Sequence, residues 1–283
     1  MLKNFSVCDI LEVSENYLEG QMAVCCEKLS ADIISSALRV DGIRVDVFDE
    51  IDSTNSEARR QIEQGKTSPA LIISDTQTGG RGRMGRSFYS PASTGLYMSM
   101  LLKVTENTVN TVRLTTAAAV AVALSIEELC GISTEIKWVN DIYLDGRKIC
   151  GILCESFLSC GERYAVIGIG VNLHTSDFPP DIRDRAASLN PREKIRNSLA
   201  AHIANTLWCF WENMSAPEIM EYYRRHSMVL GKNIVFSERG ELFCGVAEYI
   251  DDNGALDVRL EDGSHRLLSS GEISLRLTDG KYL

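Results

Sequence analysis

The run ALIIS at residues 70–74 constrains the fold most, because an apolar strand of this kind must be covered on both of its faces. A loop at residues 79–86 follows it closely and holds four glycines and three arginines. Glycine lets the backbone approach a ligand closely, and the planar arginine fork fits phosphate or carboxylate. The sequence therefore predicts an anion-binding loop, called the glycine-arginine loop below, near the end of a buried strand.

Composition limits the partners that the chain can have. Its 283 residues carry a net charge of -10 at pH 7, which argues against wrapping nucleic acid but allows a local basic site. No window approaches about 18 uninterrupted apolar residues, and the first residues do not resemble a secretory signal, so we expect no membrane partner. The nine cysteines are odd in number and form no CxxC pair, so we expect free thiols and a cytoplasmic protein.

The order of elements predicts three segments. Residues 1–42 are acidic and contain only three basic residues, which predicts a helical lead-in without a DNA-binding helix-turn-helix. Residues 43–228 alternate apolar strands with helices, which predicts an α/β (α+β) domain with a mixed β-sheet and flanking helices. Residues 229–283 contain short alternating strands between acidic, glycine-containing turns, which is typical of a small β-barrel.

Local signals place several elements within these segments. A buried helix is expected over residues 113–130, with Gly131 as its C-terminal cap. The Asp145–Gly146 pair between two apolar runs predicts a tight hairpin turn. Ser53 either caps the helix that follows it or lies at the mouth of a site, and propensity alone favours the cap. Further strands are expected at residues 43–47, 95–102, 134–141 and 164–172, and further helices at 193–214 and 216–227.

The glycine-arginine loop by itself allows several interpretations, including a solvated loop. It matches the dinucleotide-binding pattern GxGxxG, but Pro91 and the serines before it argue against the helix that this pattern requires. A nucleic-acid-binding RGG arm would be repetitive and terminal, whereas this loop is single and internal. The polar residues within 137–141, together with Lys148, supply the cations and oxygen ligands that ATP-driven activation of a carboxylate needs.

Six segments, in their order and spacing, together resemble the biotin protein ligase family. They are DSTN (52–55), QTGGRGRMGR (77–86), FYSP (88–91), KWVND (137–141), RKICGILCE (147–155) and GIGVN (168–172). The resemblance covers about residues 43–283 and implies an α/β catalytic domain followed by an SH3-like β-barrel. It also implies a two-step reaction, in which ATP activates biotin to biotinyl-5'-AMP with release of pyrophosphate. A lysine of a biotin carboxyl carrier domain then attacks this adenylate.

The resemblance also implies roles for individual residues. Biotin would be bound by Ser53, Thr54, Asn55, Gln77, Gly80, Arg81, Gly82, Arg83, Lys148 and Gly151. ATP and the adenylate would be bound by Arg81, Arg83, Arg86, Phe88, Lys137, Asn140, Lys148 and Asn172, with Gly168 also near the adenine end. Lys148, Arg83 and Asp141 would act in catalysis, and Asp141 would hold Mg²⁺. Biotin and the ATP–Mg²⁺ complex would be substrates, with no tightly bound prosthetic group.

The segments depart from the family pattern at two positions. Val139 stands where proline is common, and Phe88 stands where tryptophan is common, which removes an indole donor. Because the glycine-arginine loop lies between strands, we expect it to be mobile when empty and to close over biotin and the adenylate. The alternative functions are a lipoate or octanoate ligase or transferase, and a biotin-sensing transcriptional regulator. A ligase without DNA as a partner, with a homodimer as one option, is the expected form.

Overall fold

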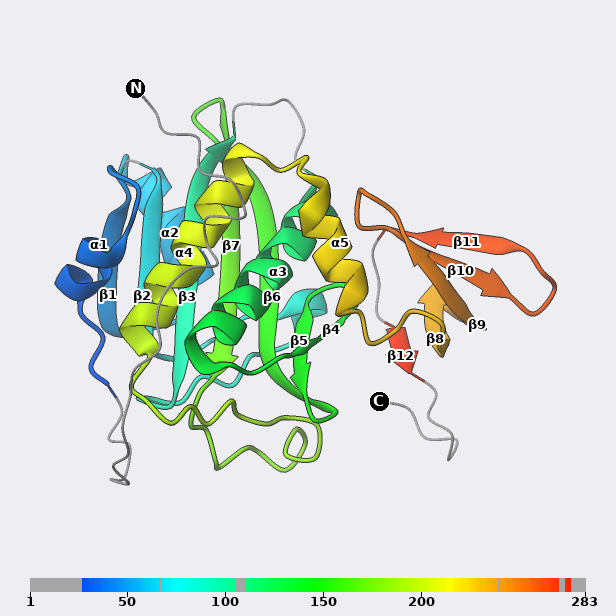
Figure 1. Cartoon of the computed structure of the whole chain (residues 1–283). Coiled ribbons are helices and arrows are strands. Elements are labelled where there is room, and N and C mark those ends of the chain that lie inside the picture. The colour runs from blue at the N-terminus through cyan, green and yellow to red at the C-terminus, as the bar shows by residue number, and fades with distance from the viewer. Residues whose placement is uncertain (1–26, 67, 105–109, 239, 270–272, 276–283) are drawn as a thin grey trace.

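The computed structural model describes residues 27–66, 68–104, 110–238, 240–269 and 273–275. Its main feature is a seven-stranded sheet in the order β1-β2-β3-β7-β6-β5-β4 (Figure 1). β1 and β2 pair in parallel and the other pairs are antiparallel, so the sheet is mixed, as the sequence predicts. The strands are β1 (Arg44–Ile51), β2 (Ala70–Gln77), β3 (Gly95–Val104), β4 (Glu135–Lys137), β5 (Asp141–Leu144), β6 (Arg147–Ser159) and β7 (Glu162–Asn172).

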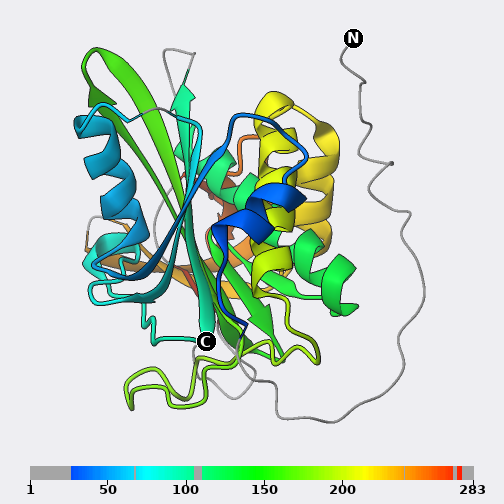
Figure 2. The same cartoon turned by 90° about the vertical axis from the view of Figure 1, so that its left-hand side faces the viewer.

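Helices cover both faces of this sheet, with α2 alone on one face and the others on the opposite face (Figure 2). The helices are α1 (Ala31–Ala37), α2 (Thr54–Glu63), α3 (Thr111–Cys130), α4 (Arg196–Glu212) and α5 (Pro217–Arg225). Ile72 of β2 packs in an apolar cluster with Ala58 of α2, whereas its neighbours Leu71 and Ile73 belong to the main core. Successive residues of β2 thus enter different clusters, which confirms that this strand is covered on both faces.

The helix expected over residues 113–130 is α3, and its ends form as the sequence predicts. The Asn110 side chain accepts hydrogen bonds from the Val112 and Arg113 amides at 3.1 and 3.0 Å, which satisfies two free donors of the first turn. Gly131 ends the helix with a positive φ of 66°, a conformation that glycine adopts without strain. Small alanine side chains, buried along α3, let this helix lie close to the sheet.

The hairpin prediction is confirmed, while two other local predictions need revision. Asp145 and Gly146 have φ of 50° and 72°, the pair of positive values that a tight type I′ turn requires. Ser53 occupies the N-cap position of α2 but makes no capping hydrogen bond, and it lines a cavity instead. The strand expected over residues 134–141 is interrupted, because the chain reverses between β4 and β5.

A second sheet, of five strands in the order β11-β10-β9-β8-β12, lies beyond α5 at the β4 side of the main sheet (Figure 1). Its strands are β8 (Asn233–Glu238), β9 (Glu241–Ile250), β10 (Leu256–Leu260), β11 (His265–Leu268) and β12 (Ile273–Leu275). All its pairs are antiparallel, which confirms a small all-β unit at this end of the chain. Among the residues described, no helix is long and apolar enough to cross a membrane.

Most of the predicted helical lead-in, residues 1–26, lies outside the described residues, so the expectation of no helix-turn-helix there stays a prediction. Its last part is attached firmly to the start of α4. The Asn197 side chain accepts from the Ser30 amide at 2.9 Å and donates to the Lys28 carbonyl at 3.0 Å. The Asn197 amide donates to the Glu27 carboxylate at 3.0 Å.

Candidate active site

A cavity of about 890 Å³ opens where the glycine-arginine loop meets β6 and β7. This volume is typical of small-molecule sites. The sequence-predicted site residues that line it are Ser53, Thr54, Asn55, Gln77, Arg81, Gly82, Arg83, Arg86, Phe88, Lys137, Asn140, Asp141, Lys148, Gly151, Gly168 and Asn172. Gly80 is the exception, because it lies within the base of the loop. The structure thus brings segments that are distant in the sequence to one place.

The wall of this cavity is positively charged, although the chain as a whole is acidic. Its cationic residues are Arg81, Arg83, Arg86, Lys137, Lys148 and Arg185, and its carboxylates are Asp141 and Asp181. This local excess of cations within a chain of net charge -10 favours a ligand with several negative charges. The prediction of an anion site in this part of the chain therefore agrees with the charge that the fold assembles.

The glycine-arginine loop is closed by its own backbone and contains a 3₁₀ turn, η2 (Arg83–Gly85). The Phe88 amide donates to the Gly80 carbonyl at 2.8 Å, and the Gly82 amide donates to the Arg86 carbonyl at 2.7 Å. A Cβ at Gly80 would lie 2.3 Å from the Phe88 carbonyl oxygen, so this position requires glycine for space. Gly80 therefore shapes the base of the loop.

Two cations of the cavity are held in place by polar neighbours. The Lys148 Nζ atom lies 2.7 Å from Asp141 Oδ1, and both side chains are half-buried. The Arg83 guanidinium donates to the Asn140 side-chain oxygen at 3.0 Å, and Asn140 in turn donates to the Ile152 carbonyl at 3.0 Å. These contacts fix both cations in the wall of the cavity, and charges held in place in this way lower the reorganisation that a reaction would require.

Two glycines opposite each other make room for an aromatic ring over the sheet. Gly151 of β6 pairs with Gly170 of β7. A Cβ at Gly170 would lie 2.4 Å from the Phe88 ring, and one at Gly151 would lie 3.1 Å from both the Phe88 ring and Lys148 Nζ. Phe88 therefore lies across both strands as an aromatic wall of the cavity.

A chain of polar contacts lies at the α2 end of the cavity. The Gln77 Oε1 atom accepts from the Thr54 amide at 2.9 Å, and Gln77 Nε2 donates to the Ser90 hydroxyl at 2.8 Å. The buried Ser99 hydroxyl lies 2.7 Å from the Thr54 hydroxyl and 2.6 Å from Asn55 Oδ1. These side chains are oriented by one another, so their remaining donors and acceptors have defined directions.

The segment after β7, residues 173–190, forms a wall of the cavity that the sequence did not predict. Its lining residues are Phe178, Asp181, Ile182, Arg185 and Ala186. It is anchored to β6, because the Lys148 amide donates to the Arg185 carbonyl at 2.8 Å and the Ala187 amide donates to the Lys148 carbonyl at 2.8 Å. Asn172 could have indicated this wall from the sequence. It is a predicted site residue at the end of β7, so the segment that follows it must begin beside the site.

Asn172 offers an acceptor that the described part of the chain does not use. Its side-chain amide donates to the Ala187 carbonyl at 3.0 Å, while its Oδ1 atom is buried without a hydrogen-bond partner among the described residues. A buried acceptor without a partner costs free energy, so such an atom marks a position where a ligand donor is favourable.

A second unpredicted feature is the buried Arg196 of α4, which supports the segment that follows the glycine-arginine loop. Its guanidinium donates to the Gly95 carbonyl at 2.9 Å and to the Glu27 carbonyl at 2.9 Å. It also lies 2.8 Å from the Asp75 carboxylate, which accepts from the Ser93 hydroxyl at 3.0 Å. One buried cation thus ties β2, the start of β3 and the N-terminal segment together.

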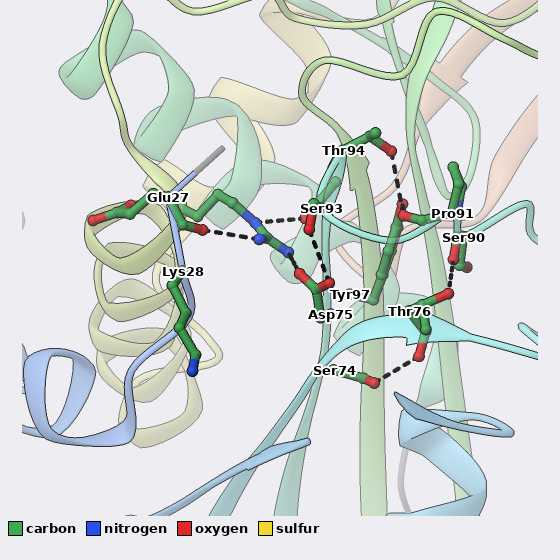
Figure 3. A network of polar contacts seen from close by, with 12 residues as sticks. Glu27, Lys28, Ser74, Asp75, Thr76, Ser90, Pro91, Ser93, Thr94 and Tyr97 are labelled. Atoms are coloured by element: carbon green, nitrogen blue, oxygen red, sulfur yellow. Dashed lines mark hydrogen bonds and ion pairs between the residues drawn. The ribbon is translucent and has the colours of Figure 1, made fainter. Parts of the chain in front are cut away.

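The same network includes the buried Tyr97, beside the segment that carries Ser90 and Pro91 (Figure 3). The Tyr97 hydroxyl donates to the Pro91 carbonyl at 3.0 Å, and burial raises the pKa of Tyr97 to about 12. The Thr76 hydroxyl donates to the Ser90 carbonyl at 2.8 Å. These contacts hold the segment that carries Ser90 and Pro91 against the end of the sheet.

The turn between β4 and β5 is fixed from two sides. The Trp138 indole donates at 2.9 Å to the Gly254 carbonyl, in the turn between β9 and β10, and the Tyr223 hydroxyl of α5 donates to the Val139 carbonyl at 3.2 Å. The Trp138–Val139 peptide bond is cis, and Val139 is buried. Ile273 of β12 also lines the cavity, so the C-terminal sheet contributes to the site.

Comparison with known proteins agrees with this arrangement. The chain matches the Biotin/lipoate A/B protein ligase family over residues 47–172 and the Biotin protein ligase C terminal domain over residues 229–276. It is 32% identical to the bifunctional ligase/repressor BirA of Bacillus subtilis, over 86% of this chain and 78% of that protein. It is 28% identical to a biotin--[acetyl-CoA-carboxylase] ligase of Mycobacterium tuberculosis, over 81% of this chain and 88% of that protein.

A solved structure gives the same result. The biotin protein ligase from Aquifex aeolicus in complex with biotin and ATP superposes with a TM-score of 0.69 at 28% identity. The match covers 83% of this chain and 99% of that chain. Fold and sequence thus place the chain among ligases of the biotin and lipoate class. Within that class, the chain belongs to the biotin protein ligase family.

Proposed function

We propose that the chain is an ATP-dependent biotin–protein ligase that acts on a biotin-dependent carboxylase. The observation that carries this proposal is one cavity in which the glycine-arginine loop, residues 137–141 and Lys148 meet. Its size suits a small molecule, and its excess of cations suits the phosphates of a nucleotide. The relatives named as biotin ligases support the choice of biotin as the carboxylate substrate.

In the first step, an oxygen of the biotin carboxylate attacks the α-phosphorus of ATP. The bond from the α-phosphorus to the bridging oxygen breaks, pyrophosphate leaves, and biotinyl-5'-AMP forms. Negative charge grows on the phosphoryl oxygens, and preorganised cations stabilise it more effectively than mobile water. We assign Lys148 and Arg83 to the biotin carboxylate and the α-phosphate, because each is already fixed in the cavity wall. Lys137 and Arg86 would contact the other phosphates.

The two ends of the cavity suit the two ends of the adenylate. Thr54, Gln77 and Ser53 would bind the polar head of biotin, since they lie together at the α2 end. The Phe88 ring would pack on the adenylate over the paired glycines of β6 and β7. Asn172 would accept a hydrogen bond from the adenine amino group with its unpartnered oxygen.

In the second step, a lysine amine of a carboxyl carrier domain attacks the carbonyl carbon of the adenylate. The bond from this carbon to the phosphate oxygen breaks, AMP leaves, and the amine loses its extra proton as the amide forms. The protein's contribution is to bind the anhydride away from water until the carrier arrives. The carrier is therefore the partner that we propose, while the oligomeric state stays open to measurement.

Mg²⁺ would enter with ATP. Within the described residues, no group of three or more histidine, cysteine or acidic side chains could hold a metal by itself. Mg²⁺ at nucleotide sites is usually held by one or two carboxylates together with substrate phosphates. Asp141 and Asp181 both line the cavity, so the donors fit a cation that arrives with the nucleotide and neutralises part of its charge.

Mass spectrometry of the protein after incubation with biotin and MgATP tests the proposal. We expect retained biotinyl-5'-AMP, pyrophosphate in the medium, and one added biotin on a carboxyl carrier domain. Lipoate in place of biotin should give no adenylate. If lipoate is activated and biotin is not, the function is that of a lipoate ligase. Salt-dependent binding of operator DNA at nanomolar protein would instead show a regulator.

The domain organisation follows the same proposal. We propose residues 43–228 as the biotin and ATP domain and residues 229–283 as an SH3-like C-terminal domain. The first sheet begins at Arg44 and the second at Asn233, which supports a boundary near residue 229. A cytoplasmic location, where ATP and carboxylases occur together, is part of this proposal.

A further inference from the structure

Glu155 of β6 forms a two-point ion pair with the glycine-arginine loop. Arg81 Nη1 donates to Glu155 Oε2 at 3.0 Å, and Arg81 Nη2 donates to Glu155 Oε1 at 2.7 Å. This parallel geometry fixes the orientation of the guanidinium as well as its distance. Arg81 occurs near the start of the loop, so the contact attaches the loop to the central sheet.

The Glu155 carboxylate is held in turn by a buried amide. Asn55 Nδ2 donates to Glu155 Oε2 at 2.9 Å and lies 3.2 Å from the Leu153 carbonyl. The Asn55 side chain has this position because β7 carries glycine beside it: a Cβ at Gly168 would lie 2.1 Å from Asn55 Oδ1. The donors of Asn55 are therefore directed at β6, and Gly168 provides the space for that arrangement.

These contacts continue to the proposed biotin-binding residues and return to the loop. Ser99 bridges Asn55 and Thr54, with hydroxyl distances of 2.6 and 2.7 Å. Thr54 bonds Gln77, and Gln77 donates to Ser90 at 2.8 Å. The Ser90 hydroxyl donates to the Phe88 carbonyl at 3.0 Å. The polar chain that starts at Arg81 thus ends at Phe88, two residues after the end of the same loop.

We propose that Glu155 is a positioning residue for the ligase reaction, which holds the glycine-arginine loop over the biotin pocket through Arg81. This inference rests on the proposed function, because it assigns a purpose to the loop only if biotin binds beneath it. The side chain of Arg81 attaches the loop to Glu155, and the backbone of Arg81 is the part that would contact the ligand. Glu155 touches no reacting atom in this scheme and acts through the loop alone.

Preorganisation of the loop determines the expected effect. We expect the empty loop to move, and the ion pair favours its position over the pocket, so the loop loses less conformational freedom when the ligand binds. Without the ion pair, binding must order the loop, and this cost lowers the affinity for biotin. Lys148 and Arg83, the cations that we assign to the phosphate, keep Asp141 and Asn140 as partners. We therefore expect a higher KM for biotin with a nearly unchanged kcat. The ion pair is partly exposed, with 45% and 24% of the two side chains accessible, so the effect should be moderate.

A double-mutant cycle tests the pairing. Glu155→Gln and Arg81→Ala should each raise the Kd and the KM of biotin about fivefold, and the double variant should raise them no further. The kcat of Glu155→Gln should change less than about twofold. Glu162→Gln is a matched control, because Glu162 pairs with Lys103 on the sheet outside the cavity, at 3.2 Å. Calorimetric titration with biotin gives the Kd, and thermal melting shows whether each variant folds.

Trypsin cleavage after Arg83 and Arg86 gives a second measurement that needs no ligand. Cleavage there should be faster in both single variants than in the wild type. The double variant should be cleaved at the same rate as the single variants. Effects that multiply in the double variant, or a Glu155→Gln protein with wild-type affinity and cleavage, would overturn the proposal. If the wild type binds no biotin, the proposed function fails, and the cleavage rates alone still decide whether Glu155 holds the loop.

Discussion

Replacement of Lys148 by alanine should lower the activity strongly and the folding stability only slightly. Its Nζ atom lies 2.7 Å from Asp141, and the side chains are 32% and 21% exposed. Loss of such a partly exposed pair costs at most about 1 kcal/mol of folding stability. Loss of a preorganised charge at a developing oxyanion costs about 2.7–4 kcal/mol of the activation barrier, or a factor of roughly 100 to 1000.

The assay is pyrophosphate release with saturating biotin and MgATP, measured beside the thermal unfolding of the same preparations. We expect adenylate formation by Lys148→Ala to fall at least about 100-fold while the protein stays folded. Lys103→Ala is the matched control, because Lys103 also pairs with a carboxylate, at 3.2 Å, but outside the cavity. Activity of a folded Lys148→Ala protein within a factor of about ten of the wild type would refute our assignment of the cation.

Three further predictions use other parts of the structure. Gly170→Ala should weaken adenylate binding by at least about tenfold, since its Cβ would lie 2.4 Å from the Phe88 ring; tight retention of biotinyl-5'-AMP in the variant would contradict this. Tyr97→Phe should remove a pH dependence: burial raises the pKa of Tyr97 to about 12, so its contribution to stability is present below pH 10 and is lost as the pH rises towards 12. Denaturant unfolding at pH 9 and 11 should therefore show a smaller loss for the variant than for the wild type. Cys160 is exposed and Cys150 is buried with a raised thiol pKa, so iodoacetamide at pH 8 should label Cys160 well before Cys150 in peptide maps.

Much of the fold was predictable because the signals are local. The apolar run in β2, the Asp145–Gly146 turn and the Gly131 cap each depend on a few neighbouring residues, and each is confirmed. Ser53 shows the limit of such signals. Propensity favoured a capping role, but Ser53 makes no capping hydrogen bond and lines the cavity. The start of α2 forms this cavity together with residues of β6 and β7, which are distant in the sequence.

The site was predictable in its residues but not in its pairings. The motifs identified the loop, residues 137–141 and Lys148, and the cavity is lined by most residues of the first two segments and by Lys148. The wall formed by residues 173–190 was missed, because it contains no motif and is recognised only by its position after β7. Assignment of binding roles to these residues stays a prediction until the variants are measured.

The sequence by itself determined which chemical groups the site contains and which strands are buried, since composition and periodicity are properties of short segments. Only the tertiary structure decided which groups meet. Arg81 and Glu155 are 74 positions apart, and Arg196 and Gly95 are 101 apart. Gly151 faces Gly170 only because β6 and β7 pair in one particular register. Contacts of this kind depend on strand order and register, which no local pattern encodes.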